Sequence, residues 1–239
     1  MSDNSNIVRY LFDLGDEVIH FEINTALSEQ ATPNKADETA PDWARLEKNQ
    51  CKCCPLKAED SKYCPTALRV HQVLERFKSH ASVQQVNLTV QTQRRTYVQK
   101  CDMQNGLNSM LGLQMATGGC PILGRLRSMA TFHMPFCSFG ETLYRSVGAY
   151  LIQQFFILKD GGEPDWELER LREFYQELEG LNKDFTERIK NIEQSDAITN
   201  AIVIFFASSI VVHFSIEEEL KEYRDYFTGK SVTPPKGGH

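Results

Sequence analysis

The sequence predicts an α+β fold, in which a small antiparallel β-sheet with one helix is followed by an α-helical bundle. Three observations lead to this prediction. Apolar and polar residues alternate through much of residues 1–100, as they do in half-buried strands. Beyond residue 101, apolar residues recur every three or four positions, which is typical of amphipathic helices. The composition, 41% hydrophobic and 24% charged over 239 residues, is that of an ordinary globular protein.

Residues 1–100 are expected to form the sheet region. Residues 7–24 read as two short strands joined by a tight turn at Gly15 and Asp16. After a polar stretch, Pro65 is expected to open a helix that reaches about Ser79. Residues 82–99 are rich in Val and Thr and predict one long strand or a second hairpin.

Residues 101–228 are expected to form the bundle, with residues 229–239 as a disordered tail. The apolar periodicity predicts helices over residues 103–115, 121–130 and 141–158, and from Pro164 to about Glu193. The sheet region and the bundle are expected to share one core, as a single integrated domain. No internal repeat is present in the sequence.

One segment, residues 197–214, is apolar enough to raise the question of a membrane span. It contains polar residues such as Asn200 and His213, and its flanks are acidic where a membrane protein would carry basic residues. We therefore expect a central buried helix of the bundle and no membrane association.

Charge and cysteine content narrow the class of protein. The chain has 26 basic and 32 acidic residues, a net charge of −6, and lacks the basic face that nucleic-acid binding requires. It has seven cysteines and starts without a recognisable signal peptide. An odd number of thiols without such a signal favours a reducing compartment, and we expect a cytoplasmic protein.

The cysteine segment, residues 51–65, is the most specific feature of the sequence. Cys51 and Cys54 form a CxxC pair within CKCCP, Cys64 follows in YCP, and Cys53 could replace either neighbour. A CxxC turn can direct two sulfurs at one metal ion, as it does in zinc sites. Because no second CxxC or paired histidines follow, the fourth ligand must come from a distant position. We expect a zinc site with the candidate ligands Cys51, Cys54, Cys64, Cys120 and His133.

Cys54, Cys64 and Cys120 each precede a proline. Proline is favoured at the first position of a helix, so the cysteine before it is expected at the N-cap. The free N–H groups and the helix dipole there favour thiolate over thiol, which predicts acidic, ligand-ready sulfurs. Four such sulfurs suit zinc or an iron–sulfur cluster, and this choice stays open.

A second group of reactive residues suggests a possible enzyme. Cys120 could act as nucleophile with His133 as its base. No recognised nucleophile motif surrounds Cys120, and the nucleotide-binding, zinc-protease and serine-hydrolase motifs are absent from the sequence. Glu141 and Arg145, four residues apart, are expected to form an ion pair on a helix. We assign no catalytic residue.

Several motifs resemble an uncharacterised bacterial protein family of unknown function. They are CKCCPL, YCP, the run MATGGCP at residues 115–121, and MATFHMPF followed by Glu141 and Thr142. The resemblance extends from the first hairpin to the penultimate helix. It implies a bacterial, cytoplasmic protein with a single integrated domain, and it implies no activity or ligand.

These observations favour a non-enzymatic binding or regulatory protein with a structural zinc site, acting on an unknown protein partner. A redox or metal sensor with an iron–sulfur cluster or a thiol switch is the main alternative. An enzyme that uses Cys120 as nucleophile is the second alternative.

Overall fold

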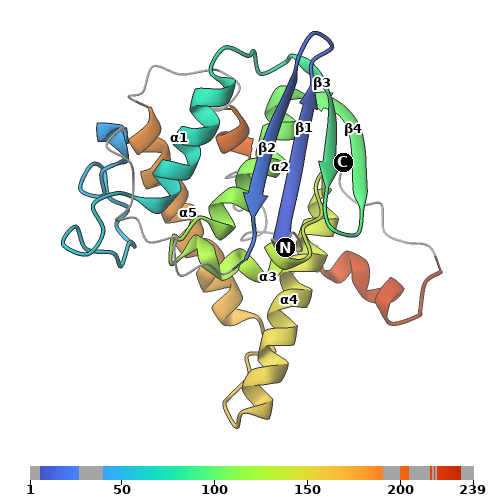
Figure 1. Ribbon diagram of the computed structural model, residues 1–239. Helices are drawn as coiled ribbons and strands as arrows, with labels where there is room; N and C mark the ends of the chain where they lie inside the picture. Colours follow the sequence, from blue (N-terminus) through green and yellow to red (C-terminus); the bar gives the residue numbers. More distant parts are fainter. Residues whose placement is uncertain are drawn as a thin grey trace. The chain divides into compact units, whose positions relative to one another are not determined.

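The computed structural model describes residues 6–26, 40–190, 200–204, 216, 218 and 220–232. Its sheet has four antiparallel strands in the order β2-β1-β3-β4 (Figure 1). The strands are β1 (Ile7–Asp13), β2 (Val18–Asn24), β3 (Gln85–Gln91) and β4 (Thr96–Asp102). The expected α+β class and the first hairpin are therefore confirmed, and the Val- and Thr-rich stretch forms a second hairpin.

One face of the sheet carries the core of this part of the molecule. Alternate residues of β1 are buried, Val8, Tyr10 and Phe12, because their side chains all point to the same face. Two helices cover that face, α1 (Pro65–Phe77) and α2 (Met103–Thr117) (Figure 1). Phe77 of α1 meets Phe12 edge-on, with ring centroids 4.9 Å apart.

Gly106 lets α2 approach the sheet closely. A Cβ atom at this position would lie 2.9 Å from Cδ2 of Leu88 and 3.0 Å from Cε1 of Phe12, and both of these side chains are fully buried. The absence of a side chain here therefore sets the distance between the helix and the sheet.

The other elements named here are two short 3₁₀ turns, one short helix and two long helices. They are the 3₁₀ turns η3 (Asp42–Ala44) and η4 (Leu123–Leu126), and the helices α3 (Arg127–Thr131), α4 (Phe139–Lys159) and α5 (Glu169–Ile189). The single helix expected over residues 121–130 is thus divided into η4 and α3. None of the described helices combines the length and the apolar character that crossing a membrane requires.

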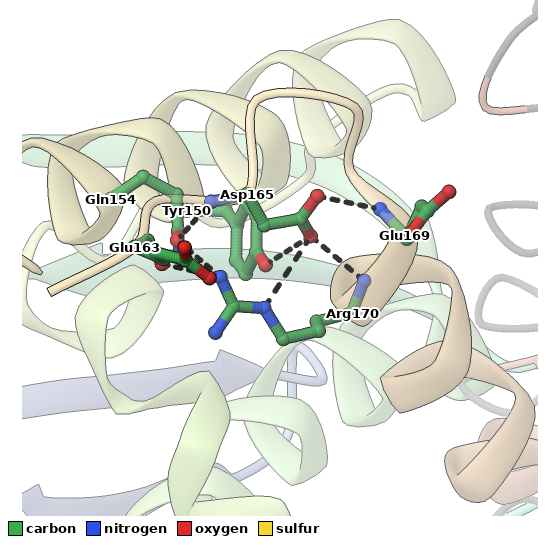
Figure 2. Close-up of polar contacts among 6 residues, drawn as sticks. All are labelled: Tyr150, Gln154, Glu163, Asp165, Glu169 and Arg170. Carbon is green, nitrogen blue, oxygen red and sulfur yellow. Dashed lines mark hydrogen bonds and ion pairs between the residues drawn. The ribbon is translucent and has the colours of Figure 1, made fainter.

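Helix α5 begins later than Pro164, where the sequence predicted its start. Asp165 is the reason, because its carboxylate accepts the N–H groups of Glu169 at 3.1 Å and Arg170 at 2.8 Å (Figure 2). These are donors that the first turn of a helix leaves unpaired. The carboxylate also accepts the Tyr150 hydroxyl of α4 at 2.6 Å, so the same residue ties α5 to α4.

The chain divides into two compact units, although not at the expected boundary near residue 100. One unit comprises the described residues of 1–136 and 180–205, and the other those of 137–179 and 206–239. Helix α2, which its helical pattern assigned to the bundle, packs on the sheet through Gly106. The helix expected over residues 197–214 and the expected disordered tail lie largely outside the described residues.

Replacing Gly106 by Val should lower the free energy of unfolding by about 1–3 kcal/mol, because the new side chain overpacks a filled core. Urea denaturation followed by circular dichroism measures this loss. Gly180→Val is the matched control, because a Cβ at this helical glycine meets nothing within 4 Å. Equal effects of the two substitutions would contradict the close packing of α2 on the sheet.

Candidate functional site

A short backbone pairing joins the residues just before the cysteine segment to the end of that segment. Arg45 and Tyr63 form an isolated antiparallel bridge. On either side of it, the N–H of Leu46 donates to the carbonyl of Lys62 at 3.0 Å, and the N–H of Cys64 donates to that of Ala44 at 2.8 Å. The segment between Leu46 and Lys62 is therefore a closed loop.

Arg188 of α5 organises the chain that leads into this loop. Its two terminal nitrogens donate four hydrogen bonds of 2.7–3.2 Å to backbone carbonyls of the preceding segment, those of Trp43, Arg45, Leu46 and Asn49. The Arg188 side chain is almost fully buried, at 2% exposed, and its Nε has no hydrogen-bond partner. No carboxylate among the described residues forms an ion pair with it.

The CxxC pair lies in a tight turn next to the same helix. The N–H of Cys54 donates to the carbonyl of Cys51 at 3.0 Å, which closes the turn. Within the turn, the N–H of Lys52 donates to the Asp184 carboxylate of α5 at 2.7 Å. Asp184 and Arg188 are one helical turn apart, so α5 fixes both the entry to the loop and the CxxC turn.

Cys64 is at the start of a helix, as its proline predicted, but the N-cap prediction is wrong for Cys120, because the N-cap residue of η4 is Ile122. It is also wrong for Cys54, because no helix begins at Pro55. Cys64 is the N-cap residue of α1, and Cys120 precedes Pro121 and η4. Cys64 makes no side-chain capping hydrogen bond of ordinary length, but the N–H groups of Ala67 and Thr66 lie close enough to lower its pKa. The N–H groups of Leu123 and Ile122 have the same effect on the pKa of Cys120.

Burial nevertheless dominates, so the prediction of acidic sulfurs is wrong for the metal-free chain. Burial raises the pKa of Cys64 and of Cys120, and it raises the pKa of Cys51 to about 12. The sequence argument considered the helix N-termini, which lower the pKa, but it could not include the larger cost of placing a thiolate in the interior.

Electrostatic effects connect the four candidate sulfurs in pairs. After burial, the next influences on the pKa of Cys51 are the thiols of Cys64 and Cys53, which raise it, and Arg188, which lowers it. Cys120 raises the pKa of Cys64, and Cys54 raises that of Cys120. Cys51 and Cys64 are therefore near the guanidinium of Arg188, and Cys120 is near Cys64 and Cys54. Across the described residues, no group of three or more His, Cys, Asp or Glu side chains has the arrangement of a formed metal site.

His133, the alternative fourth ligand, is bound to the sheet. Its Nε2 lies 2.5 Å from the hydroxyl of Tyr10, a fully buried residue of β1. Tyr10 is also 3.3 Å from the hydroxyl of Ser109 on α2. The structure thus gives this nitrogen a protein partner, and Cys120 is the better candidate for the fourth ligand.

The second group of reactive residues has local structural uses. Glu141 forms a capping box with Ser138 at the start of α4, and it accepts the N–H of Ser138 at 2.8 Å. Arg145 donates to the sulfur of Cys137 at 3.2 Å. The first turn of α4 therefore accounts for Glu141 without a catalytic role.

Comparison with known sequences gives a family but no activity. The family described as a domain of unknown function, DUF6901, matches residues 7–228. The chain belongs to the DUF6901 family. This agrees with the resemblance to an uncharacterised family that the motifs suggested. No curated protein and no solved structure matches the chain.

The sequence analysis missed three residues near the candidate cysteines of this DUF6901 protein, namely Arg188, Asp184 and Thr66. Arg188 could have been suspected, because it lies three residues after Phe185 and therefore on the apolar stripe of its helix. Thr66 lowers the pKa of Cys120 through its hydroxyl, and its buried Oγ1 has no other partner. Nothing in the sequence distinguishes Thr66 or Asp184 from other polar helix residues.

Replacing Arg188 by Lys should destabilise the protein by about 3 kcal/mol or more. Lysine keeps the charge but cannot donate in the geometry of the guanidinium, so several buried carbonyls lose their partners at about 1–3 kcal/mol each. Chemical denaturation measures the loss. The same substitution at the exposed Arg94 should change stability by less than about 0.5 kcal/mol, and a similar loss at both positions would contradict the role of Arg188.

The reduced, metal-free protein should become less stable as the pH rises above about 9. The buried thiols have pKa values raised above the ordinary 9.0, so the unfolded chain releases protons first and alkaline pH favours unfolding. Each such thiol contributes a slope of up to about 1.4 kcal/mol per pH unit. Denaturation between pH 7 and alkaline pH, with chelator and reductant present, measures the slope. Cys51→Ser should reduce it, and stability that rises with pH would contradict the raised pKa values.

Proposed function

We propose that this protein is a non-enzymatic binding or regulatory protein whose cysteine segment is held in place by a zinc ion. The proposed ligands are the sulfurs of Cys51, Cys54, Cys64 and Cys120. The observation that supports the proposal is that Cys51 and Cys64 both lie close enough to the buried Arg188 for its charge to lower their pKa, while Cys120 influences the pKa of Cys64 and Cys54 that of Cys120.

The charge of Arg188 supports a metal–thiolate site. A buried cation without a carboxylate partner is costly unless another negative charge lies nearby. Asp184 lies one helical turn from Arg188 and forms no ion pair with it, and thiols with raised pKa values are neutral at pH 7 and supply no charge. A zinc ion with four thiolates carries a net charge of −2, so it would offset the guanidinium that faces Cys51 and Cys64.

The groups around the sulfurs are those that metal–thiolate sites use. The N–H groups at the starts of α1 and η4 face Cys64 and Cys120, and the otherwise unpartnered Thr66 hydroxyl faces Cys120. Donors of this kind orient thiolate ligands and stabilise their charge. Binding requires the CxxC turn to close on the other two sulfurs, with Zn–S distances of about 2.3 Å.

In this proposal the zinc ion links three parts of one unit, the closed loop, the start of α1 and the turn after α2. Its binding free energy is then folding free energy for a loop that has few regular elements. All seven cysteines are free thiols in the structure, in keeping with the proposed cytoplasmic location.

An enzyme with Cys120 as nucleophile is less well supported. Burial raises the pKa of Cys120, which leaves little thiolate at neutral pH. The imidazole proposed as its base is hydrogen-bonded to Tyr10 instead.

Protein purified without oxygen should contain about one zinc ion per chain by elemental analysis and should be colourless. Cys51→Ser and Cys120→Ser should each reduce the zinc content to a small fraction of this value, because a site with three sulfurs binds much more weakly. Cys137→Ser is the matched control, since this thiol lies at the start of α4, and it should retain the metal.

Three outcomes would reject the proposal. A brown protein containing iron and sulfide would indicate the iron–sulfur alternative. Metal-free protein that does not take up zinc from solution would leave Arg188 as a purely structural residue. Rapid and selective alkylation of Cys120 at neutral pH would favour the enzyme.

A further inference from the structure

Helix α4 has an apolar face that the described residues leave largely open to solvent, although Tyr144 at one end meets Phe227 with ring centroids 5.9 Å apart. On one side the helix buries Leu143, Val147 and Gln154. The other side carries large apolar residues that are between 47% and 64% exposed, namely Tyr144, Ile152, Phe155, Phe156 and Leu158. A helix that is apolar all round is normally buried on every side, so this face is expected to have a partner.

The spacing of the residues along this face is that of a helix pair. Residues 144, 148, 151, 155 and 158 follow one another at intervals of four, three, four and three. Intervals of this kind form the contact seam between two packed helices. No charged residue interrupts the seam between Arg145 and Lys159.

Gly148 lies in the middle of the seam and does not pack closely on any described residue of the protomer. A Cβ atom at this position would meet nothing within 4 Å. A glycine inside a helix costs about 1 kcal/mol relative to alanine. A glycine here allows another backbone to approach closely, and none of the described residues of the protomer does so.

The helix that carries the seam is firmly held from its buried side. Asp165 accepts the hydroxyl of Tyr150 at 2.6 Å and donates its own N–H to Gln154 at 2.9 Å (Figure 2). One turn earlier, the hydroxyls of Ser146 and Tyr175 are 2.6 Å apart. The apolar face is therefore presented by a helix with a fixed orientation, which lowers the entropic cost of binding.

We propose that α4 pairs with α4 of a second copy of this chain, antiparallel and about a twofold axis near Leu151. The seam is nearly symmetric about this residue, which lies seven positions from both Tyr144 and Leu158. An antiparallel pair then places each of these residues opposite the other in the second copy. Such a self-complementary contact closes on itself, as in the commonest class of homodimer.

Charge favours the antiparallel arrangement. Residues 160–179 contain eight acidic and two basic residues, a net charge of −6 directly after α4. A parallel pair would bring two such segments together, whereas an antiparallel pair separates them by about the 30 Å length of the helix. The antiparallel pair also brings Lys159 of one copy within about one turn of Glu141 of the other.

The apolar area is sufficient for a specific contact. A large apolar side chain buries roughly 150–250 Å² when fully covered, so the four that lie on or beside the seam and are about half exposed, Tyr144, Ile152, Phe155 and Leu158, contribute roughly 400 Å² per copy. Their neighbours on the helix supply the remainder of the approximately 800 Å² per partner that is usual in specific interfaces.

Sedimentation of the full-length protein over a range of concentrations tests the proposal. The wild type should be a dimer, and Gly148→Leu should raise the dissociation constant about tenfold or more, because the side chain separates the two helices. Leucine favours the helix and meets nothing in the protomer, so the variant should fold at least as well as the wild type. Gly180→Leu, the same change at an open helical glycine of α5, should leave the dimer intact.

A cysteine at position 151 tests the geometry. Leu151→Cys should form an intermolecular disulfide in a glutathione redox buffer under conditions in which the wild type does not. A wild type that stays monomeric overturns the proposal, and so does a dimer that Gly148→Leu leaves unchanged. Binding of α4 to a different protein by a monomeric wild type would also overturn it. These outcomes do not depend on zinc.

Discussion

The hydrogen bonds of one buried guanidinium hold together the part of the molecule that has the least regular structure. Arg188 donates to four carbonyls between Trp43 and Asn49, and these carbonyls belong to a segment with only a short 3₁₀ turn. A chain segment of this kind cannot satisfy its own backbone groups. The position of the CxxC turn therefore depends on α5, a helix more than a hundred residues away in the sequence.

The same residue connects structure with the proposed function. Arg188 has a structural use as a donor, and its charge needs a compensating negative group. The backbone carbonyls accept its hydrogen bonds but do not offset its charge, whereas a metal–thiolate centre nearby would offset the charge. Folding of the loop and binding of zinc would then be two aspects of one equilibrium, which is usual where a metal replaces a hydrophobic core.

The sheet and most helices could be predicted because their signals are local. Val8, Tyr10 and Phe12 alternate as a half-buried strand requires, and Pro65 marks the start of α1. Two other features could not be predicted, the packing of α2 on the sheet and the four hydrogen bonds that Arg188 donates. Both depend on residues that are far apart in the sequence. The spacing of the cysteines predicted the candidate ligands, and their convergence on one metal ion stays a prediction. The sign of the pKa shifts of Cys64 and Cys120 could not be predicted, because it depends on burial.

The bridge between Arg45 and Tyr63 also bears on evolutionary change. The residues from Lys57 to Asp60 are exposed and lie between the CxxC turn and the backbone pairing at Tyr63. Packing against other parts of the protein therefore does not limit the number of residues in this stretch. Adding residues to such an exposed excursion costs little chain entropy, because that cost grows only with the logarithm of loop length. Related chains can therefore differ in length at this point while their cysteines keep the same spatial arrangement.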